Sequence, residues 1–189
     1  MPDILNVLDA SVSEFPSSLT TGEESFMREL VTVNSIAMGN QQLRLTYCTI
    51  RKSATRTQVR LSSGAVAAGA TPTLVRFGIW RSNDDGDLLE LLASTPNDTA
   101  LLNSTFADYT KSFSAPFNAQ RGMRVAGGLL VVTGATAPQV CGSSPAHNTS
   151  QLGAAPRLSA LLSSQADLPA TAAAGSLTNT SLRPIFVLL

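Results

Sequence analysis

Histidine and cysteine are scarce in this sequence, and their scarcity narrows the chemistry open to the chain. His147 is the only histidine among 189 residues, and Cys48 and Cys141 are the only cysteines. One imidazole excludes most metal sites and catalytic triads, because no spacing singles out a serine beside it. Two cysteines permit one disulfide at most. We therefore predict that the protein is not an enzyme and has no cofactor, and we assign no residue to catalysis, cofactor binding or metal binding.

The sequence also lacks net charge and long apolar runs. Its 13 basic and 13 acidic side chains cancel, which argues against a nucleic-acid or membrane-surface partner. The longest stretch without a charged side chain, residues 125–156, contains Gly127, Gly128 and Pro138, so it does not fit a membrane-spanning helix of about 20 residues. The first ten residues lack the basic and apolar regions of a signal peptide. We expect no membrane insertion and a protein that stays in the cytoplasm until it is assembled.

The charges that cancel overall are separated along the chain. Residues 1–30 carry six acids and one arginine, whereas residues 31–81 carry seven bases and no acid. Residues 82–110 carry six acids and no base, and the remainder is net positive. Blocks of one sign suit a surface that pairs with other copies or with neighbouring proteins. The alternative is that strands bring the opposite blocks together within one chain.

From Gln42 onward the sequence alternates apolar and polar residues, which is typical of half-buried strands. Such strands are predicted over residues 42–51, 55–61 and 73–81. Asn83–Asp87 then predicts a hairpin turn, because Asp-Gly adopts positive φ at little cost. It resembles half of a calcium loop, but the flanking segments are strands and Glu90 is too close. We interpret it as a solvated turn.

Further strands follow the predicted hairpin. Residues 88–94 return from the turn, and residues 111–117 form a short strand stopped by Pro116. Residues 123–133 are apolar on both faces, as expected of a central covered strand, and residues 182–189 form the last strand. The pattern predicts an all-β fold, a jelly-roll-like antiparallel β-sandwich of about eight strands over residues 42–189.

Two regions are harder to interpret. Residues 1–41 form a predicted N-terminal arm, extended or partly helical, whose end is an alternative first strand. Within residues 22–33, Thr21 and Glu24 fit a helix capping box, but β-branched residues favour a strand over residues 26–33. Residues 134–181 are predicted to be mostly loop with one short strand, at residues 157–162.

Trp80 is the only tryptophan and invites a functional interpretation. It lies on the opposite face of its predicted strand from Val75, Phe77 and Ile79. An exposed indole could stack on a sugar ring or anchor a protein contact. We predict a surface ligand contact at Trp80, and the alternative is that its side chain fills a second layer of the sandwich.

Several segments together resemble a β-sandwich module of minor tail proteins from tailed phages that infect actinobacteria. The segments, in order along the chain, are residues 43–61, 67–80, 92–101, 115–133 and 167–177. The resemblance covers roughly residues 40–189 and contains no catalytic signature. In that family the module often follows a collagen-like or coiled stalk, whereas only some 40 residues precede it here. Direct attachment to a virion surface is therefore expected.

The resemblance implies a virion structural protein, assembled in the host cytoplasm. The leading hypothesis is a minor tail or tail-tip protein that acts in assembly and in host attachment. One alternative is a capsid decoration or head-fibre protein, and another is a carbohydrate-binding receptor module for a host surface glycan. The expected partners are other virion proteins and copies of the same chain, in a homotrimer.

Two sets of residues are predicted to make the assembly contacts. Ile4, Leu5 and Leu8 in the arm are expected to fill a groove on a neighbouring subunit. The acidic arm would then lie against an arginine-rich face. The arginines assigned to that face are Arg44, Arg51, Arg56 and Arg60.

Overall fold

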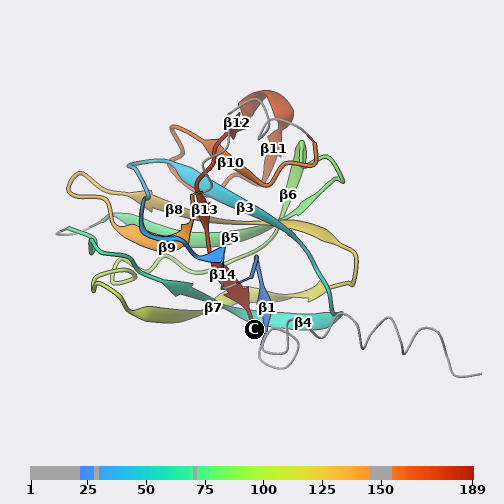
Figure 1. Cartoon of the computed structure of the whole chain (residues 1–189), viewed down its shortest axis with the longest axis horizontal. Coiled ribbons are helices and arrows are strands. Elements are labelled where there is room, and N and C mark those ends of the chain that lie inside the picture. Colours follow the sequence, from blue (N-terminus) through green and yellow to red (C-terminus); the bar gives the residue numbers. More distant parts are fainter. Residues whose placement is uncertain (1–21, 28–29, 70–71, 145–154) are drawn as a thin grey trace, which may run out of the picture.

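The computed structural model describes residues 22–27, 30–69, 72–144 and 155–189. Within these residues every strand pairing is antiparallel, and the only helical element with assigned bounds is a 3-10 turn at Ala174–Ser176, η2. Two layers of sheet face each other across an apolar core (Figure 1). The predicted all-β sandwich is confirmed.

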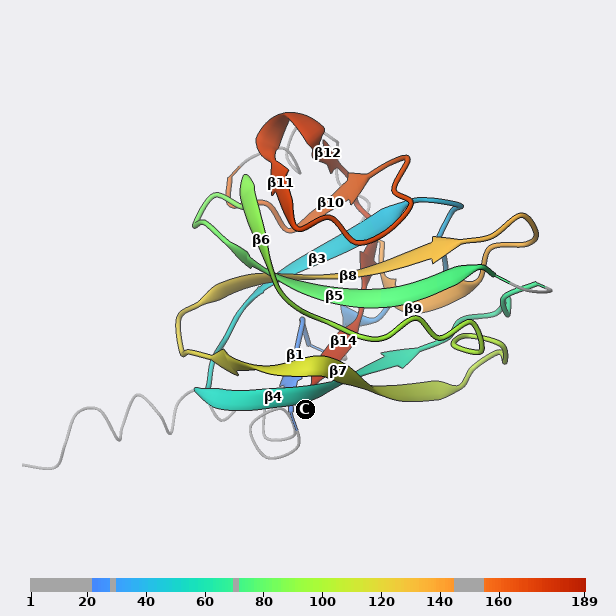
Figure 2. The ribbon, with the colours of Figure 1, turned by 180° about the vertical axis from the view of Figure 1, so that it is seen from behind.

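The larger layer is a seven-stranded sheet. Its spatial order is β11 (Thr171–Ala173), β6 (Leu88–Ser94), β5 (Leu74–Ser82), β8 (Arg124–Val132), β3 (Leu43–Thr49), β10 (Ser159–Leu162) and β12 (Thr178–Asn179). Its two edge strands, β11 and β12, are joined in the chain by only the 3-10 turn and Leu177. The sheet must therefore curl until its edges approach each other, as seen from behind in Figure 2.

The opposing layer contains two smaller sheets. One has the order β1 (Glu23–Glu24), β14 (Phe186–Leu188), β4 (Ala54–Ser62) and β7 (Asp108–Ala119). The other has the order β13 (Arg183–Pro184), β9 (Gln139–Ser143) and β2 (Val33–Ala37). The predicted last strand is thus divided, because β13 pairs with β9 whereas β14 pairs with β4 and β1.

The curled sheet is packed by side chains on both faces. Val75, Phe77 and Ile79 lie in the core between the layers, as predicted. Leu43, Leu45 and Trp80 lie in a second apolar cluster on the opposite face, which the curl of the sheet encloses. Among the described residues, both faces at the centre of the sheet are therefore covered by apolar side chains.

Strand β8 contributes to both clusters, as predicted for a central covered strand. Its two adjacent glycines leave room for side chains from opposite sides. A Cβ on Gly127 would lie 2.3 Å from the Phe186 ring, and a Cβ on Gly128 would lie 2.6 Å from Leu45. Bare backbone at Gly127 is required for the close approach of the two layers, and at Gly128 it makes room for Leu45 in the second cluster.

Strand β7 does not stop at Pro116, contrary to the prediction. It continues to Ala119, and its register with β4 shifts between the pairs Arg56–Phe117 and Gln58–Ser112. Pro116 lies inside this irregular stretch, and β7 is an edge strand. A proline at a bulge of an edge strand removes no ladder hydrogen bond, so the strand tolerates it.

The described part of the predicted arm contributes strands to the sandwich, which the alternative of a first strand at the end of the arm allowed. Strand β1 pairs with β14 and β2 pairs with β9, so residues 22–27 and 30–41 belong to the sandwich. The favoured strand over residues 26–33 is not formed at Phe26, Met27 or residues 30–32. Strand pairing is available only on either side of that segment, because β14 and β9 lie in different sheets.

The predicted loop region contains more strand than expected. Strand β10 matches the expected short strand, whereas β9, β11 and β12 were not predicted. These strands are two to five residues long and rich in alanine, glycine and threonine. Such short segments show no alternation that a sequence pattern could reveal.

The close contact at Gly127 gives a test of the packing between layers. Gly127→Ala is expected to lower the free energy of unfolding by about 1–3 kcal/mol, because the buried Phe186 ring blocks the new methyl group. Gly175→Ala is the matched control, since nothing lies within 4 Å of a Cβ there. Urea denaturation followed by tryptophan fluorescence measures both. Equal losses in the two variants would contradict the packing.

Candidate functional site

Two of the four predicted contact arginines form ion pairs with a buried carboxylate of the same chain. The Arg51 Nε lies 2.6 Å from Glu23 Oε1, and the Arg56 Nη2 lies 3.5 Å from Glu23 Oε2. The Glu23 side chain is only 2% exposed. For these residues the acidic and basic blocks therefore meet within one chain, which was the alternative interpretation.

The same arginines also bind backbone carbonyls. Arg51 Nη2 donates to the carbonyl of Glu24, and Arg56 Nη1 donates to the carbonyl of Leu188. These bonds thus hold β1 and β14 against the β3–β4 turn, which carries Arg51, and the start of β4, which carries Arg56. Arg44, on β3, donates to the Gln42 side chain, and burial lowers the pKa of its guanidinium.

Arg60 is the exception among the four. It lies on the outer face of β4, where its Nε donates to Thr110 Oγ1 at 3.4 Å. That weak bond is the only hydrogen bond or ion pair of its guanidinium in the part of the chain that the structure describes. It belongs to a row of polar pairs between β4 and β7, the other members being Thr55–Asn118, Gln58–Ser112 and Ser62–Asp108.

A groove of about 300 Å³ opens beside Arg60. Its apolar walls are Val31, Ile185, Phe186 and Val187, and its polar walls are Arg60, Ser62, Asp108 and Cys141. Phe186 lies in the core cluster, so its chain neighbours, Ile185 just before β14 and Val187 on β14, face outward. The groove therefore combines an aliphatic floor with a cation at its side.

Asp108, the one acidic residue among the described residues that line the groove, already has a hydrogen-bond partner. Asp108 accepts a hydrogen bond from the Ser62 hydroxyl. The Cys141 Sγ lies 3.3 Å from the Ser63 carbonyl, and burial, followed by the negative charge of Asp108, raises the pKa of its thiol. Cys141 is thus a neutral wall of the groove near neutral pH.

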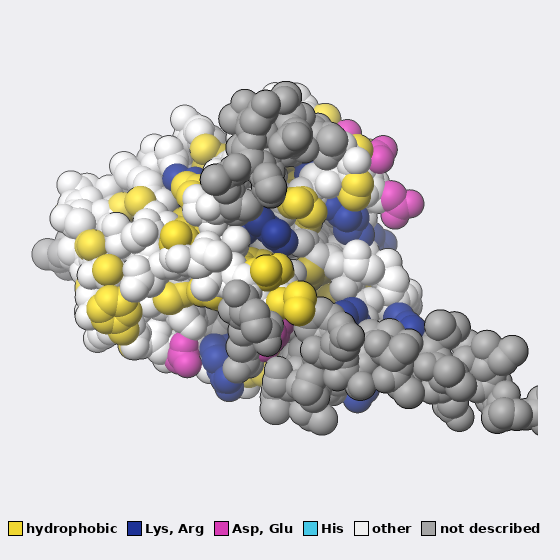
Figure 3. All heavy atoms as spheres, viewed as in Figure 1, with side chains coloured by type: hydrophobic (Ala, Val, Ile, Leu, Met, Phe, Trp, Pro, Cys, Tyr) yellow, Lys and Arg dark blue, Asp and Glu magenta, His cyan; other side chains and the backbone are white. Residues whose placement is uncertain are grey.

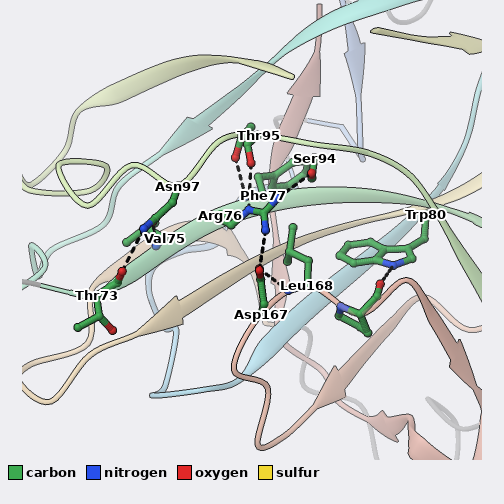
Figure 4. Close-up of polar contacts among 11 residues, drawn as sticks. Thr73, Val75, Arg76, Phe77, Trp80, Ser94, Thr95, Asn97, Asp167 and Leu168 are labelled. Atoms are coloured by element: carbon green, nitrogen blue, oxygen red, sulfur yellow. Dashed lines mark hydrogen bonds and ion pairs between the residues drawn. The ribbon is translucent and has the colours of Figure 1, made fainter. Parts of the chain in front are cut away.

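The prediction of a surface ligand contact at Trp80 is wrong. Trp80 is fully buried in the second cluster, and its indole N–H donates to the Pro169 carbonyl at 2.9 Å (Figure 4). Gly78 leaves space for the ring, since a Cβ there would lie 2.5 Å from it. Trp80 therefore fills the second layer, as the alternative proposed, because the curled sheet encloses that face.

Polar residues along β5, the strand that carries Trp80, hold neighbouring loops in place. Arg76 binds Asp167 at 2.6 Å and also donates to the Ser94 hydroxyl and the Thr95 carbonyl (Figure 4). Asn97 accepts from the Val75 amide and donates to the Thr73 carbonyl, so its side chain acts as a strand partner for β5. These contacts account for the polar side chains without a ligand.

The acidic block after β5 forms the predicted hairpin turn. Gly86 has a φ of 82°, and the Asn83 Oδ1 accepts from the Asp87 and Leu88 amides. Acidic side chains gather at this end of the sheet (Figure 3), and Asp87 is paired with Arg157 at 2.7 Å. Across the described residues, no group of three acidic, histidine or cysteine side chains is placed to hold a metal ion.

Sequence reasoning missed one exposed aromatic residue and most of the groove. Phe106 is 67% exposed and has a φ of 50°, which is uncommon for a bulky residue. The groove residues Val31, Cys141 and Ile185 come from distant parts of the chain, so no local motif could identify them. The predicted contacts Ile4, Leu5 and Leu8 lie outside the described residues.

Comparison with known proteins assigns no family. No protein-family model matches the chain, and no curated protein matches it. Among the described residues there is also no helix long and apolar enough to cross a membrane. Any functional proposal therefore depends on the surface chemistry and on the sequence resemblance.

The buried carboxylate predicts a large effect of a small substitution. Glu23→Gln is expected to lower the free energy of unfolding by about 3–5 kcal/mol, because it leaves the Arg56 guanidinium buried without its counter-charge. Asp87→Asn is the control, since that carboxylate is 39% exposed and should cost less than about 1 kcal/mol. Urea denaturation at neutral pH compares the two. A small loss for Glu23→Gln would contradict this account.

Cys48 predicts how stability changes at alkaline pH. Burial, followed by the charge of Glu23, raises the pKa of its thiol from 9.0 to about 12. The unfolded chain loses this proton near pH 9 and the folded chain keeps it, so stability must fall as pH rises through that window. Burial also raises the pKa of Tyr47 to about 12, with the same sign. Cys48→Ala should therefore flatten the decline between pH 8 and 11 in urea denaturation, and parallel curves would contradict it.

Proposed function

We propose that this chain is a structural component of a tailed-phage virion, most closely a minor tail or tail-tip protein. The observation that carries the proposal is the groove beside Arg60, on an outer sheet face where another chain can reach it. An aliphatic floor with a weakly bonded arginine is the chemistry of a protein contact. The resemblance of residues 40–189 to the phage module supports the same function.

The packing of the interior supports a rigid structural role. Both faces of the curled sheet are filled by apolar clusters, so the sandwich presents its functional chemistry on outer surfaces. In this proposal the chain assembles with other virion proteins and with copies of itself, with a homotrimer as the expected form. Host attachment would use the same exposed position on the particle.

The same groove also supports the capsid decoration or head-fibre alternative, since it does not depend on where the partner lies. The carbohydrate-binding alternative has lost its expected residue, because Trp80 is buried. Location on the particle therefore separates the two remaining hypotheses.

Purified particles test the proposal directly. An antibody against the chain should label phage particles that band in a density gradient, with gold at the tail. Label on the head would support the decoration alternative instead. A variant lacking residues 1–20 should keep the β-sheet circular dichroism spectrum but be absent from particles, because the arm is the expected docking element. Detection of the native chain only in the soluble fraction would refute a virion function.

A further inference from the structure

We infer that the groove beside Arg60 receives residues 3–9 of a second copy of this chain. The inference rests on the proposed self-assembly and names the surface through which the copies meet. Its starting point is the groove itself, which has an aliphatic floor and a cation with one weak partner among the described residues. A complementary occupant must bring aliphatic side chains and a carboxylate together.

The segment of residues 3–9 has that composition. Its sequence, Asp-Ile-Leu-Asn-Val-Leu-Asp, places four aliphatic residues between two aspartates. A hollow of about 300 Å³ is at the small end for ligand pockets and accommodates a few side chains of a peptide. The aliphatic side chains can contact Ile185 and Val187, while Asp3 or Asp9 neutralises Arg60.

The other arginines of the predicted face do not compete for this segment. Arg51 and Arg56 form ion pairs with Glu23. Arg44 donates to Gln42 and lies on β3, in a different sheet from Arg60. A carboxylate entering the groove meets Asp108 as well, but Asp108 is already hydrogen-bonded to Ser62. Arg60 is therefore the residue that gives the contact its charge specificity.

The direction of β1 favours a second copy over the same chain. Glu24 pairs with Val187 and Glu23 pairs with Leu188, and Gly22 lies against the backbone of Leu188. Read from Glu24 back to Gly22, the described chain therefore runs away from Ile185 and from the groove. A neighbouring copy can supply the segment without a reversal, and 21 residues span up to about 70 Å when extended. Exchange of an identical segment between copies is a common route to closed oligomers.

Sedimentation velocity of the full chain over a range of concentrations tests the inference. The native chain should form an oligomer, and Arg60→Glu should raise its dissociation constant at least about tenfold. Arg81→Glu is the matched control, since Arg81 is an exposed arginine on β5, and it should leave association unchanged. Circular dichroism melting checks that each variant is folded.

A charge exchange identifies the partner of Arg60. Asp3→Lys with Asp9→Lys should weaken association in the native background and restore it in the Arg60→Glu background. An excess of a synthetic peptide of residues 1–12 should dissociate the native oligomer. Recovery of association in the combined variant would establish that these residues meet across copies.

Several outcomes would overturn the inference. A native chain that stays monomeric, including one whose own segment fills the groove, excludes exchange between copies. An oligomer that is unaffected by Arg60→Glu or by the peptide must use another surface. These failures are distinct from failure of the proposed function, because labelling of virions does not depend on how copies of the chain meet.

Discussion

The Phe186 ring lies against the bare backbone of Gly127, and this contact fixes the relation between the two layers of the sandwich. Phe186 lies on β14 in the four-stranded sheet, and its ring is 5.3 Å from that of Phe77 across the core. Because strand side chains alternate, an inward Phe186 requires Ile185 and Val187 to face outward. The aliphatic floor of the groove is thus a direct consequence of how the core is closed. Strand β1 then adds to the free edge of β14 and brings Glu23 to its arginines.

The arginines of the predicted contact face differ in their partners, since Arg51 and Arg56 pair with a buried carboxylate whereas Arg60 does not. Burial of Glu23 is favourable only because Arg51 and Arg56 both reach it, and one missing partner would leave a buried charge uncompensated. These residues stabilise the junction of β1, β14 and the β3–β4 turn, where several chain segments meet. Arg60 lies four residues after Arg56 on β4, among the polar cross-strand pairs and only half-buried. The net charge of zero therefore includes two different cases. The charge of Glu23 is balanced inside the chain by Arg51 and Arg56, whereas Arg60 has only a neutral hydroxyl as its partner among the described residues.

The strands were predictable where alternation extends over at least five residues. Strands β3, β4, β5, β6 and β8 follow the expected ranges closely, since each buries one or both faces in a way that the residue pattern records. Short strands such as β11 and β12 depend on pairing partners distant in sequence, so no pattern announces them. Trp80 shows why a binding site is harder to predict than a strand. The alternation correctly placed its side chain on the face opposite Phe77, but that face is buried by the curl of the sheet, which is a property of the tertiary structure. The groove was unpredictable for the same reason, as its walls come from distant parts of the chain and meet only in the folded sandwich.

The two-sided packing of the curled sheet also explains why the surface features lie where they do. Because the curled sheet is filled on both faces, the outer face of the four-stranded sheet is the broad surface available for contact. On that face, the polar pairs between β4 and β7 present hydroxyl and amide groups, whereas the aliphatic residues of β14 are concentrated in one groove. Apolar surface confined to a groove with a charge at its side favours a specific contact over general adhesion, because an occupant must match both shape and charge. The core of this sandwich and its candidate assembly surface are therefore two sides of one strand.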